Sequence, residues 1–202
     1  MKQRTDLFIE VPKGVSPPGF DTYLITEHVV RHRGRTLLDM GSGSGYIAIH
    51  AAKNGKDCVA SDIHQLACMT TKENALKNSV SVEVVQSDLF EHIAGKFDLI
   101  SFNPPYGSSS SSPGSAMLEF IKSLVPRNNV LIAEAAFLVV QRDRKRFIQT
   151  FLDQVSHYLN TSGDVLLLLH YREVKDILDR YKGSVVGESR WMRLVLIPAT
   201  SF

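Results

Sequence analysis

The tetrapeptide Asn103-Pro104-Pro105-Tyr106 combines residue types that could hold a planar nitrogen for chemistry. The Asn103 side-chain oxygen and the Pro104 carbonyl can accept the two N–H bonds of an NH₂ group, and the prolines restrict the backbone that orients this carbonyl. Tyr106 can lie flat against a planar acceptor. An amide nitrogen is a poor nucleophile because its lone pair is delocalised, so orientation is the main catalytic task. These four residues are the predicted catalytic residues. The alternative is a strand that ends at a proline, with a surface tyrosine.

A glycine-rich turn, Gly41-Ser42-Gly43-Ser44-Gly45, lies between a predicted strand and a predicted helix. In open α/β sheets such a unit supplies a ligand site at the carboxyl ends of the strands. Its G-x-G-x-G spacing, with Tyr46 next, differs from the G-x-G-x-x-G that brings a pyrophosphate to a helix N-terminus. The turn therefore favours a ligand without phosphates, and a purely structural turn is an equal alternative.

Three aspartates, Asp39, Asp62 and Asp88, lie at the ends of three successive predicted strands. Asp39 could pair with an ammonium group, and Asp62 could accept hydrogen bonds from ribose hydroxyls. Together with Asp88 they match the amino acid, ribose and adenine amino group of S-adenosylmethionine, which is the predicted cofactor. Each aspartate taken alone could instead be a helix cap.

Other candidate sites are weaker. His28 and His32 have the spacing of a metal pair on a helix, but no carboxylate partner is indicated, so we expect a solvated helix face and no metal. The basic run Arg142–Arg146 could meet a phosphate backbone or an acidic partner, although a solvated helix start is the commoner explanation. Trp191 is expected to pack in or beside the last pair of strands.

Short β-rich runs alternate with helical stretches, which predicts an α/β, Rossmann-like, mostly parallel sheet of six or seven strands with helices on both faces. The expected strands are residues 36–40, 58–61, 82–86, 97–102 and 165–169, and the expected helices are residues 46–54, 65–78, 142–159 and 173–181. The runs 183–187 and 192–197 could pair antiparallel at the C-terminal end. Residues 130–140 fit either a strand or a helix.

An N-terminal arm and helix, residues 1–34, precede this core, and Asp21 or Thr22 could cap a helix reaching Arg31. Residues 107–114 include Ser108 to Ser112, whose side chains cannot build a core, and indicate a mobile loop that could act as a lid.

The length of 202 residues suits one domain over the whole chain. No apolar run could cross a bilayer or form a signal core, so a soluble, cytoplasmic protein without a membrane partner is expected. Cys58 and Cys68 make neither a metal-binding spacing nor a disulfide framework. A net charge of +2 is too small to indicate nucleic acid by itself.

Four segments together resemble the class I S-adenosylmethionine-dependent methyltransferases, and most closely the HemK-type glutamine-N5 methyltransferases of release factors. The segments are Leu37-Leu38-Asp39-Met40-Gly41-Ser42-Gly43-Ser44-Gly45, Ser61-Asp62-Ile63, Ser87-Asp88-Leu89 and Phe97-Asp98-Leu99-Ile100-Ser101-Phe102-Asn103-Pro104-Pro105-Tyr106. Asp21-Thr22-Tyr23-Leu24-Ile25 is similar to the stretch before the core in the archaeal and eukaryotic branch of that family. The resemblance covers residues 17–106.

The resemblance implies cofactor contacts, which with the remaining motif residues give a predicted S-adenosylmethionine site of Thr22, Asp39, Gly41, Gly43, Gly45, Asp62, Ile63, Asp88, Leu89 and Asn103. It also implies that Asn103 to Tyr106 hold the acceptor. In that branch the acceptor is the glutamine of a Gly-Gly-Gln motif in a translation release factor, and a small zinc-binding activator protein commonly takes part. Some relatives methylate protein lysine.

Two departures from the family pattern fall on the substrate side. Phe20 stands where the family usually has an acidic residue, and the serine-rich loop replaces a segment rich in Trp and Gly. N6-adenine methyltransferases of RNA and DNA use the same tetrapeptide to hold an exocyclic amine, so a nucleic acid acceptor is the main alternative. A scaffold without methyl donor is disfavoured, because Asp39, Asp62, Asp88 and Asn103 are intact.

Overall fold

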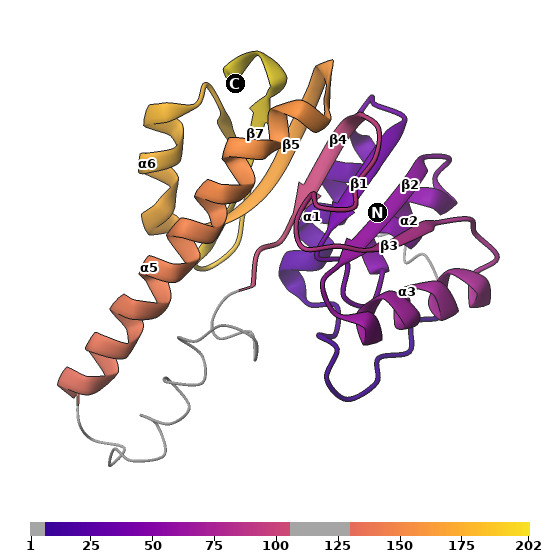
Figure 1. Cartoon of the computed structure of the whole chain (residues 1–202), viewed down its shortest axis with the longest axis horizontal. Coiled ribbons are helices and arrows are strands. Elements are labelled where there is room, and N and C mark those ends of the chain that lie inside the picture. The colour runs from indigo at the N-terminus through magenta and orange to yellow at the C-terminus, as the bar shows by residue number, and fades with distance from the viewer. Residues whose placement is uncertain (1–6, 106–129) are drawn as a thin grey trace. The chain divides into compact units, whose positions relative to one another are not determined.

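The computed structural model describes residues 7–105 and 130–202, and residues 130–141 by their backbone alone. Within these ranges one sheet of seven strands has the order β3-β2-β1-β4-β5-β7-β6. The strands are β1 (Thr36–Met40), β2 (Asp57–Asp62), β3 (Glu83–Gln86), β4 (Phe97–Phe102), β5 (Leu159–His170), β6 (Ser184–Glu188) and β7 (Met192–Pro198) (Figure 1). Strands β1 to β5 pair in parallel, whereas β7 runs antiparallel to both β5 and β6. The predicted fold class is therefore confirmed, including its antiparallel C-terminal pair.

The helices agree with the predicted periodicity, apart from the two ends of the helix predicted at residues 142–159. They are α1 (Phe20–Arg31), α2 (Tyr46–Lys53), α3 (Gln65–Lys77), α5 (Val130–Val155) and α6 (Tyr171–Arg180). The ambiguous residues 130–140 are helical and form the first part of α5. This helix ends at Val155, before the predicted Leu159, because a 3₁₀ turn at Ser156–Tyr158 follows and Leu159 already pairs with Phe97 of β4.

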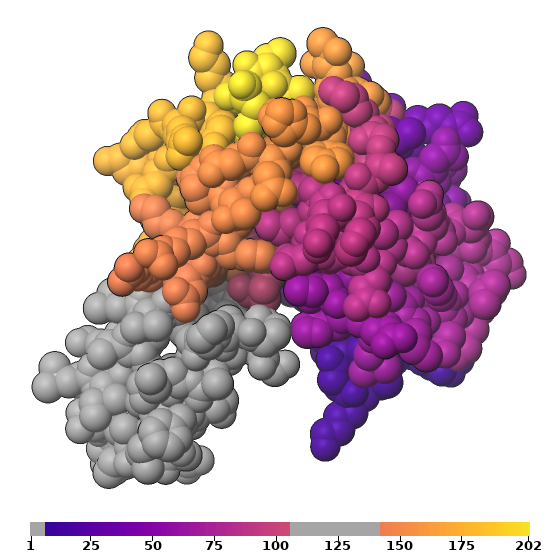
Figure 2. Space-filling view, in the orientation of Figure 1, coloured from indigo at the N-terminus to yellow at the C-terminus, as the bar shows by residue number. Residues whose placement is uncertain are grey.

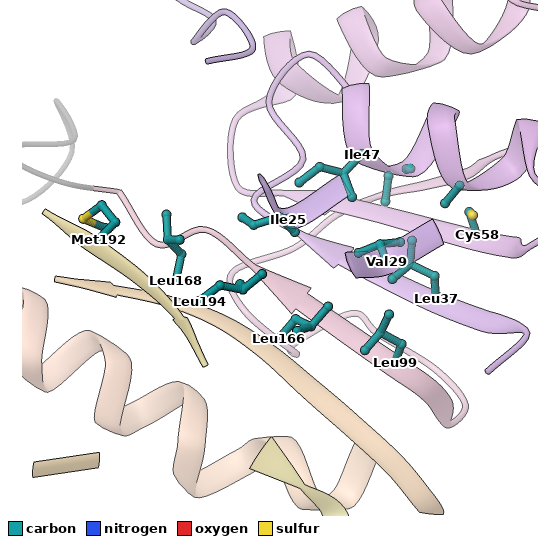
Figure 3. Packing of buried hydrophobic residues seen from close by; sticks show 13 residues of the cluster. Ile25, Val29, Leu37, Ile47, Cys58, Leu99, Leu166, Leu168, Met192 and Leu194 are labelled. Carbon is teal, nitrogen blue, oxygen red and sulfur yellow. The ribbon is translucent and has the colours of Figure 1, made fainter. Parts of the chain in front are cut away.

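Apolar side chains cover both faces of the central strands. On one face Ile25 and Val29 of α1 and Ile47 of α2 pack with Leu37, Leu99, Leu166 and Leu168 of the sheet, as Figure 3 shows. Val165, Leu167 and Leu169 alternate with that set along β5 and are also fully buried. Because β5 is buried on both faces, its sequence is a continuous apolar run. On the second face, α6 approaches β7 near Leu178 and Ile197.

The start of α1 differs from the predicted cap. Gly19 is the N-cap residue, and its backbone N–H donates to Thr22 Oγ1 at 3.2 Å. Thr22 therefore lies in the first turn and supports the cap from inside the helix. Asp21 accepts a hydrogen bond from the Ser189 hydroxyl at 3.0 Å, which ties α1 to the turn between β6 and β7.

The expectation of a solvated histidine face on α1 is wrong. His28 Nε2 lies 2.8 Å from the Val186 carbonyl of β6, and His32 Nε2 lies 2.9 Å from Asp164 of β5. The His32 side chain is only 10% exposed. Because Gly34 N–H donates to His32 Nδ1, the Nε2 atom carries the proton that faces Asp164. Both histidines fasten α1 to the sheet, and no metal-binding cluster occurs among the described residues.

The chain divides into two compact units, residues 1–103 with 154–202, and residues 104–153. A single domain over residues 1–202 remains a prediction. Cys58 and Cys68 are buried thiols without a disulfide. No helix in the described ranges is long and apolar enough to cross a bilayer. The serine-rich loop at 107–114 lies outside the described residues.

Candidate functional site

Parallel pairing brings four polar strand ends to one edge of the larger unit. The order β3-β2-β1-β4 places Asp88 after β3, Asp62 at the end of β2, Asp39 near the end of β1 and Asn103 after β4. Since these strands run in parallel, their carboxyl ends lie side by side, the edge where open α/β sheets bind ligands. The pairing of the strands thus brings together residues that are up to 64 positions apart in the sequence, as Asp39 and Asn103 are.

The glycine turn after β1 needs its glycines. Gly41, Gly43 and Gly45 have φ values of 69°, 54° and 80°, in the left-handed region that side chains disfavour. Gly45 is also crowded, because a Cβ there would lie 2.7 Å from Thr71 Cγ2. The Ser42 N–H donates to the Ser61 carbonyl at 2.9 Å, which holds the turn against β2.

Polar residues of α3 hold this turn from the other side. Thr71 Oγ1 donates to the Gly43 carbonyl at 3.2 Å, and Asn74 Nδ2 donates to the Ser44 carbonyl at 2.9 Å. Asn74 also exchanges two hydrogen bonds with the backbone of Glu10 in the N-terminal arm, and Asn78 does the same with Phe8. In Figure 2 the arm (indigo) lies next to α3 (purple). These buried residues were not predicted, because a polar helix stripe is typical of a solvated face.

Asp39 is a buried carboxyl group with one unused oxygen. Its Oδ1 accepts a hydrogen bond from Ser101 of β4 at 3.0 Å, while Oδ2 has no hydrogen-bond partner among the described residues. Burial raises the pKa of Asp39 to about 7, against the opposing effects of the Ser101 hydroxyl and the Ala48 amide at the start of α2. An unpaired buried acceptor is costly, so this site suits a ligand that brings a cation or a donor. Ser101 was missed, although a serine inside an apolar strand was a usable signal.

Asp62 already organises the turn. Its Oδ2 accepts from Gly43 N–H and its Oδ1 accepts from His64 N–H, both at 3.0 Å. Each carboxylate oxygen can accept a further bond, so both oxygens retain capacity for ribose hydroxyls. Ile63, the next residue, is 47% exposed and offers an apolar surface beside them.

The turn after β3 carries Asp88 and Leu89. Asp88 is exposed, and Leu89 has a φ of 45°, a left-handed conformation that is uncommon for a residue with a side chain. Ser87 supports this turn by accepting from His92 N–H and donating to the Leu89 carbonyl. Such local strain is typical of residues whose position serves a ligand.

The backbone after β4 receives support that was not predicted. Arg144 of α5 donates from Nη1 to the carbonyls of Pro104 and Pro105, both at 2.7 Å, and Arg144 is buried. The interpretation of residues 142–146 as a solvated helix start is therefore wrong, because α5 begins at Val130 and Arg144 is buried. Arg142 and Arg146 are exposed, as expected. Asn103 is half-buried, and Tyr106 lies outside the described residues.

Trp191 lies beside the last strand pair, as predicted, but it is 53% exposed. The Arg190 guanidinium lies 5.2 Å from the centre of its ring, and the Tyr171 ring lies 6.0 Å away. Arg172 lies over Tyr171 in the same way, at 5.6 Å. Because Tyr171 follows β5 and Trp191 precedes β7, this pair lies at the same sheet edge as Asn103.

Fold and site together define a class I S-adenosylmethionine-dependent methyltransferase, in which a glycine turn and acidic strand ends precede an Asn-Pro-Pro segment. Residues 19–156 match the methyltransferase small domain family, and the chain belongs to that family. Relatives named for glutamine methylation place it near the HemK-type enzymes, as the sequence predicted.

Three curated relatives illustrate the range of acceptors. A candidate protein N5-glutamine methyltransferase of Methanocaldococcus jannaschii is 43% identical over 93 residues, which are 46% of this chain and 47% of that protein. The release factor glutamine methyltransferase of Streptococcus pneumoniae is 29% identical over 83% of this chain and 58% of its own length. The ribosomal RNA small subunit methyltransferase C of Pasteurella multocida is 35% identical over 52% of this chain and 34% of its own length. The chain thus spans only part of each relative.

Solved structures confirm the fold. A methyltransferase from Pyrococcus furiosus has a TM-score of 0.68 at 16% identity, over 98% of this chain and 91% of that chain. The Thermus thermophilus 16S rRNA N2 G1207 methyltransferase, in complex with AdoMet and guanosine, has a TM-score of 0.61 at 15% identity, over 92% of this chain and 44% of that chain.

Substituting Gly45 with alanine should destabilise the protein more than the matched change Gly55→Ala. Both glycines have φ values near 80°, so both variants lose about 1–2 kcal/mol from the left-handed backbone. Gly45→Ala also forces Cβ against Thr71, whereas no described atom lies within 4 Å of a Cβ at Gly55. Urea unfolding of the two variants measures the difference. Equal losses would show that Thr71 does not restrict the turn.

The raised pKa of Asp39 predicts an unusual pH dependence of stability. Because the folded protein holds this proton up to about pH 7 and the unfolded chain only up to about pH 4, the free energy of unfolding should fall as the pH rises between these values. The fall attributable to Asp39 is about 4 kcal/mol. Urea unfolding from pH 4 to pH 8 should show this slope in the wild type relative to Asp39→Asn. Parallel curves for the two proteins would contradict the assignment.

Proposed function

We propose that this chain transfers a methyl group from S-adenosylmethionine to the side-chain amide nitrogen of a glutamine in a translation release factor. The observation that carries the proposal is the Asn103-Pro104-Pro105 segment directly after β4, the strand next to β1 with its glycine turn and unpaired Asp39 oxygen. Relatives named as glutamine methyltransferases support the choice of acceptor, as does the match at Asp21 to Ile25.

The donor set of the site fits S-adenosylmethionine. The unpartnered Asp39 oxygen can pair with the ammonium of the amino acid part, which would stabilise the ionised carboxylate. Asp62 has free lone pairs for the ribose hydroxyls. The adenine is proposed to contact Asp88, Ile63 and Leu89. Bound S-adenosylmethionine supplies a methyl group on a cationic sulfonium.

The acceptor residues have a positioning task. Asn103 Oδ1 and the Pro104 carbonyl accept the two N–H bonds of the glutamine amide, which turns the nitrogen lone pair toward the methyl group. Transfer breaks the sulfonium S–CH₃ bond and forms the N–CH₃ bond, so the sulfur leaves as a neutral thioether and the positive charge passes to the nitrogen. The nitrogen then releases one strongly acidic N–H proton to water, and therefore it needs no strong general base. No metal is required, and Tyr106 is proposed to lie against the planar amide.

The proposed partners follow from the proposal of glutamine methylation. A release factor is the proposed protein substrate, with a small zinc-binding protein as activator, and the cytoplasm is the proposed place of action because release factors act on ribosomes. Thr22 is proposed to approach the cofactor from α1, where its hydroxyl already accepts the Gly19 N–H.

The second candidate function is N6-methylation of adenine in RNA or DNA. It is favoured by the exposed Tyr171 and Trp191 rings, each with an arginine above it, at the sheet edge that carries Asn103. Exposed aromatic rings with arginine are typical of surfaces that stack single-stranded bases. They are equally typical of protein interfaces, so this observation ranks below the glutamine relatives.

Methyl transfer in a cell extract, which also supplies activator proteins, tests the proposal. With labelled S-adenosylmethionine, the wild type should label a release factor but not its Gln→Ala form, and nuclease treatment should leave the label intact. Asn103→Ala should lower the rate about 100-fold or more, because the nitrogen loses one of its two acceptors.

Label that disappears with ribonuclease or DNase would replace glutamine by adenine as the acceptor. Equal labelling of the release factor and its Gln→Ala form would contradict the proposed site of modification. Thermal unfolding of Asn103→Ala serves as the control for folding.

A further inference from the structure

Arg144 is a cation in an unusual position. It is 5% exposed, although Arg142, Lys145 and Arg146 around it are exposed. Burying a guanidinium is costly unless its N–H groups find acceptors. Two of these acceptors are the consecutive carbonyls of Pro104 and Pro105, each 2.7 Å from the same nitrogen, Nη1.

This geometry fixes the direction of both carbonyls. A hydrogen bond from a charged donor is about twice as strong as a neutral one, and two carbonyls that share one donor cannot rotate independently. Proline already restricts the φ angles of residues 104 and 105, so the remaining freedom lies mainly in ψ, which sets the carbonyl direction. Arg144 removes that freedom. Each carbonyl oxygen keeps one further lone pair, so the Pro104 oxygen can still accept an N–H bond.

We propose that Arg144 is the positioning residue of the acceptor segment, which holds the Pro104 carbonyl in the direction that receives the NH₂ group. This inference rests on the proposed role of Asn103-Pro104 in holding a planar nitrogen. It does not depend on whether that nitrogen belongs to glutamine or adenine, because both present an NH₂ group.

The same contacts disfavour a phosphate-binding role for Arg144 itself. A phosphate-binding face needs its cations exposed on one side, whereas Arg144 points to backbone carbonyls and away from solvent. Arg142 and Arg146 are the exposed members of the run and provide matched controls.

Loss of Arg144 should affect methyl transfer and spare cofactor binding. Small displacements of a reacting nitrogen lower rates by about 100-fold, so Arg144→Ala should reduce kcat by about that factor. The Kd for S-adenosylmethionine should change less than twofold, because Asp39 and Asp62 keep their partners. Arg144→Lys should be faster than Arg144→Ala, because it keeps a cationic donor. Free guanidinium ion added to Arg144→Ala should likewise restore part of the lost rate. Arg142→Ala and Arg146→Ala should remain within twofold of the wild type.

The experiment combines single-turnover methyl transfer, calorimetry with S-adenosylmethionine and thermal unfolding on these variants, using whichever acceptor the wild type labels. Carbon-13 shifts of the Pro104 and Pro105 carbonyls report the contact without activity, and they should change in Arg144→Ala but not in Arg142→Ala. Unchanged kcat in Arg144→Ala overturns the proposal, as do unchanged carbonyl shifts or a loss of cofactor affinity equal to the loss of rate. If the wild type labels no acceptor, the proposed function is refuted. Carbonyl shifts that still depend on Arg144 would then show that the contact exists without that function.

Discussion

The buried carboxyl group of Asp39 is the constraint around which the candidate site is organised. It lies in β1, between β2 and β4, and one oxygen accepts the Ser101 hydroxyl of β4 while the other has no partner in the described part of the chain. Burial holds its pKa near 7, so near neutral pH the folded protein carries a proton that a cationic ligand would displace. A group of this kind lowers the stability of the fold above its pKa, and functional sites are where proteins tolerate such groups.

The glycine turn that follows β1 is held by polar contacts from β2 and α3. Asp62 accepts the Gly43 N–H, Thr71 donates to the Gly43 carbonyl, and Asn74 joins the Ser44 carbonyl to the N-terminal arm. The turn is therefore formed in advance, which lowers the conformational cost of binding a ligand. Its glycines permit the left-handed backbone, and Thr71 leaves no room for a side chain at Gly45.

Local patterns predicted most of the fold, because the strands are short β-rich runs that end at turn residues, and the alternation of β1, β2 and β3 with helices α2 and α3 favours a parallel sheet. They also predicted Asp39, Asp62 and Asn103 at one edge. What they missed depends on distant contacts. Thr71 and Asn74 of α3, and Asn78 directly after it, contact the glycine turn or the arm instead of water. His32 contacts Asp164, and Arg144 donates to two carbonyls 39 and 40 residues away. Composition cannot distinguish a polar residue with a buried partner from one in solvent. The choice between glutamine and adenine depends on the surface around Asn103 and not on the strand ends that are proposed to bind the cofactor.

The central claim is that the Asp39 carboxylate receives the ammonium group of S-adenosylmethionine, and proton release on binding tests it most directly. Calorimetric titrations at pH 6 in two buffers of different ionisation enthalpy give the number of protons released per ligand bound. With a pKa near 7, Asp39 should lose close to one proton on binding at this pH, and the release should vanish in Asp39→Asn. Binding without proton release at pH 6 would contradict the claim, and so would the same release from the variant.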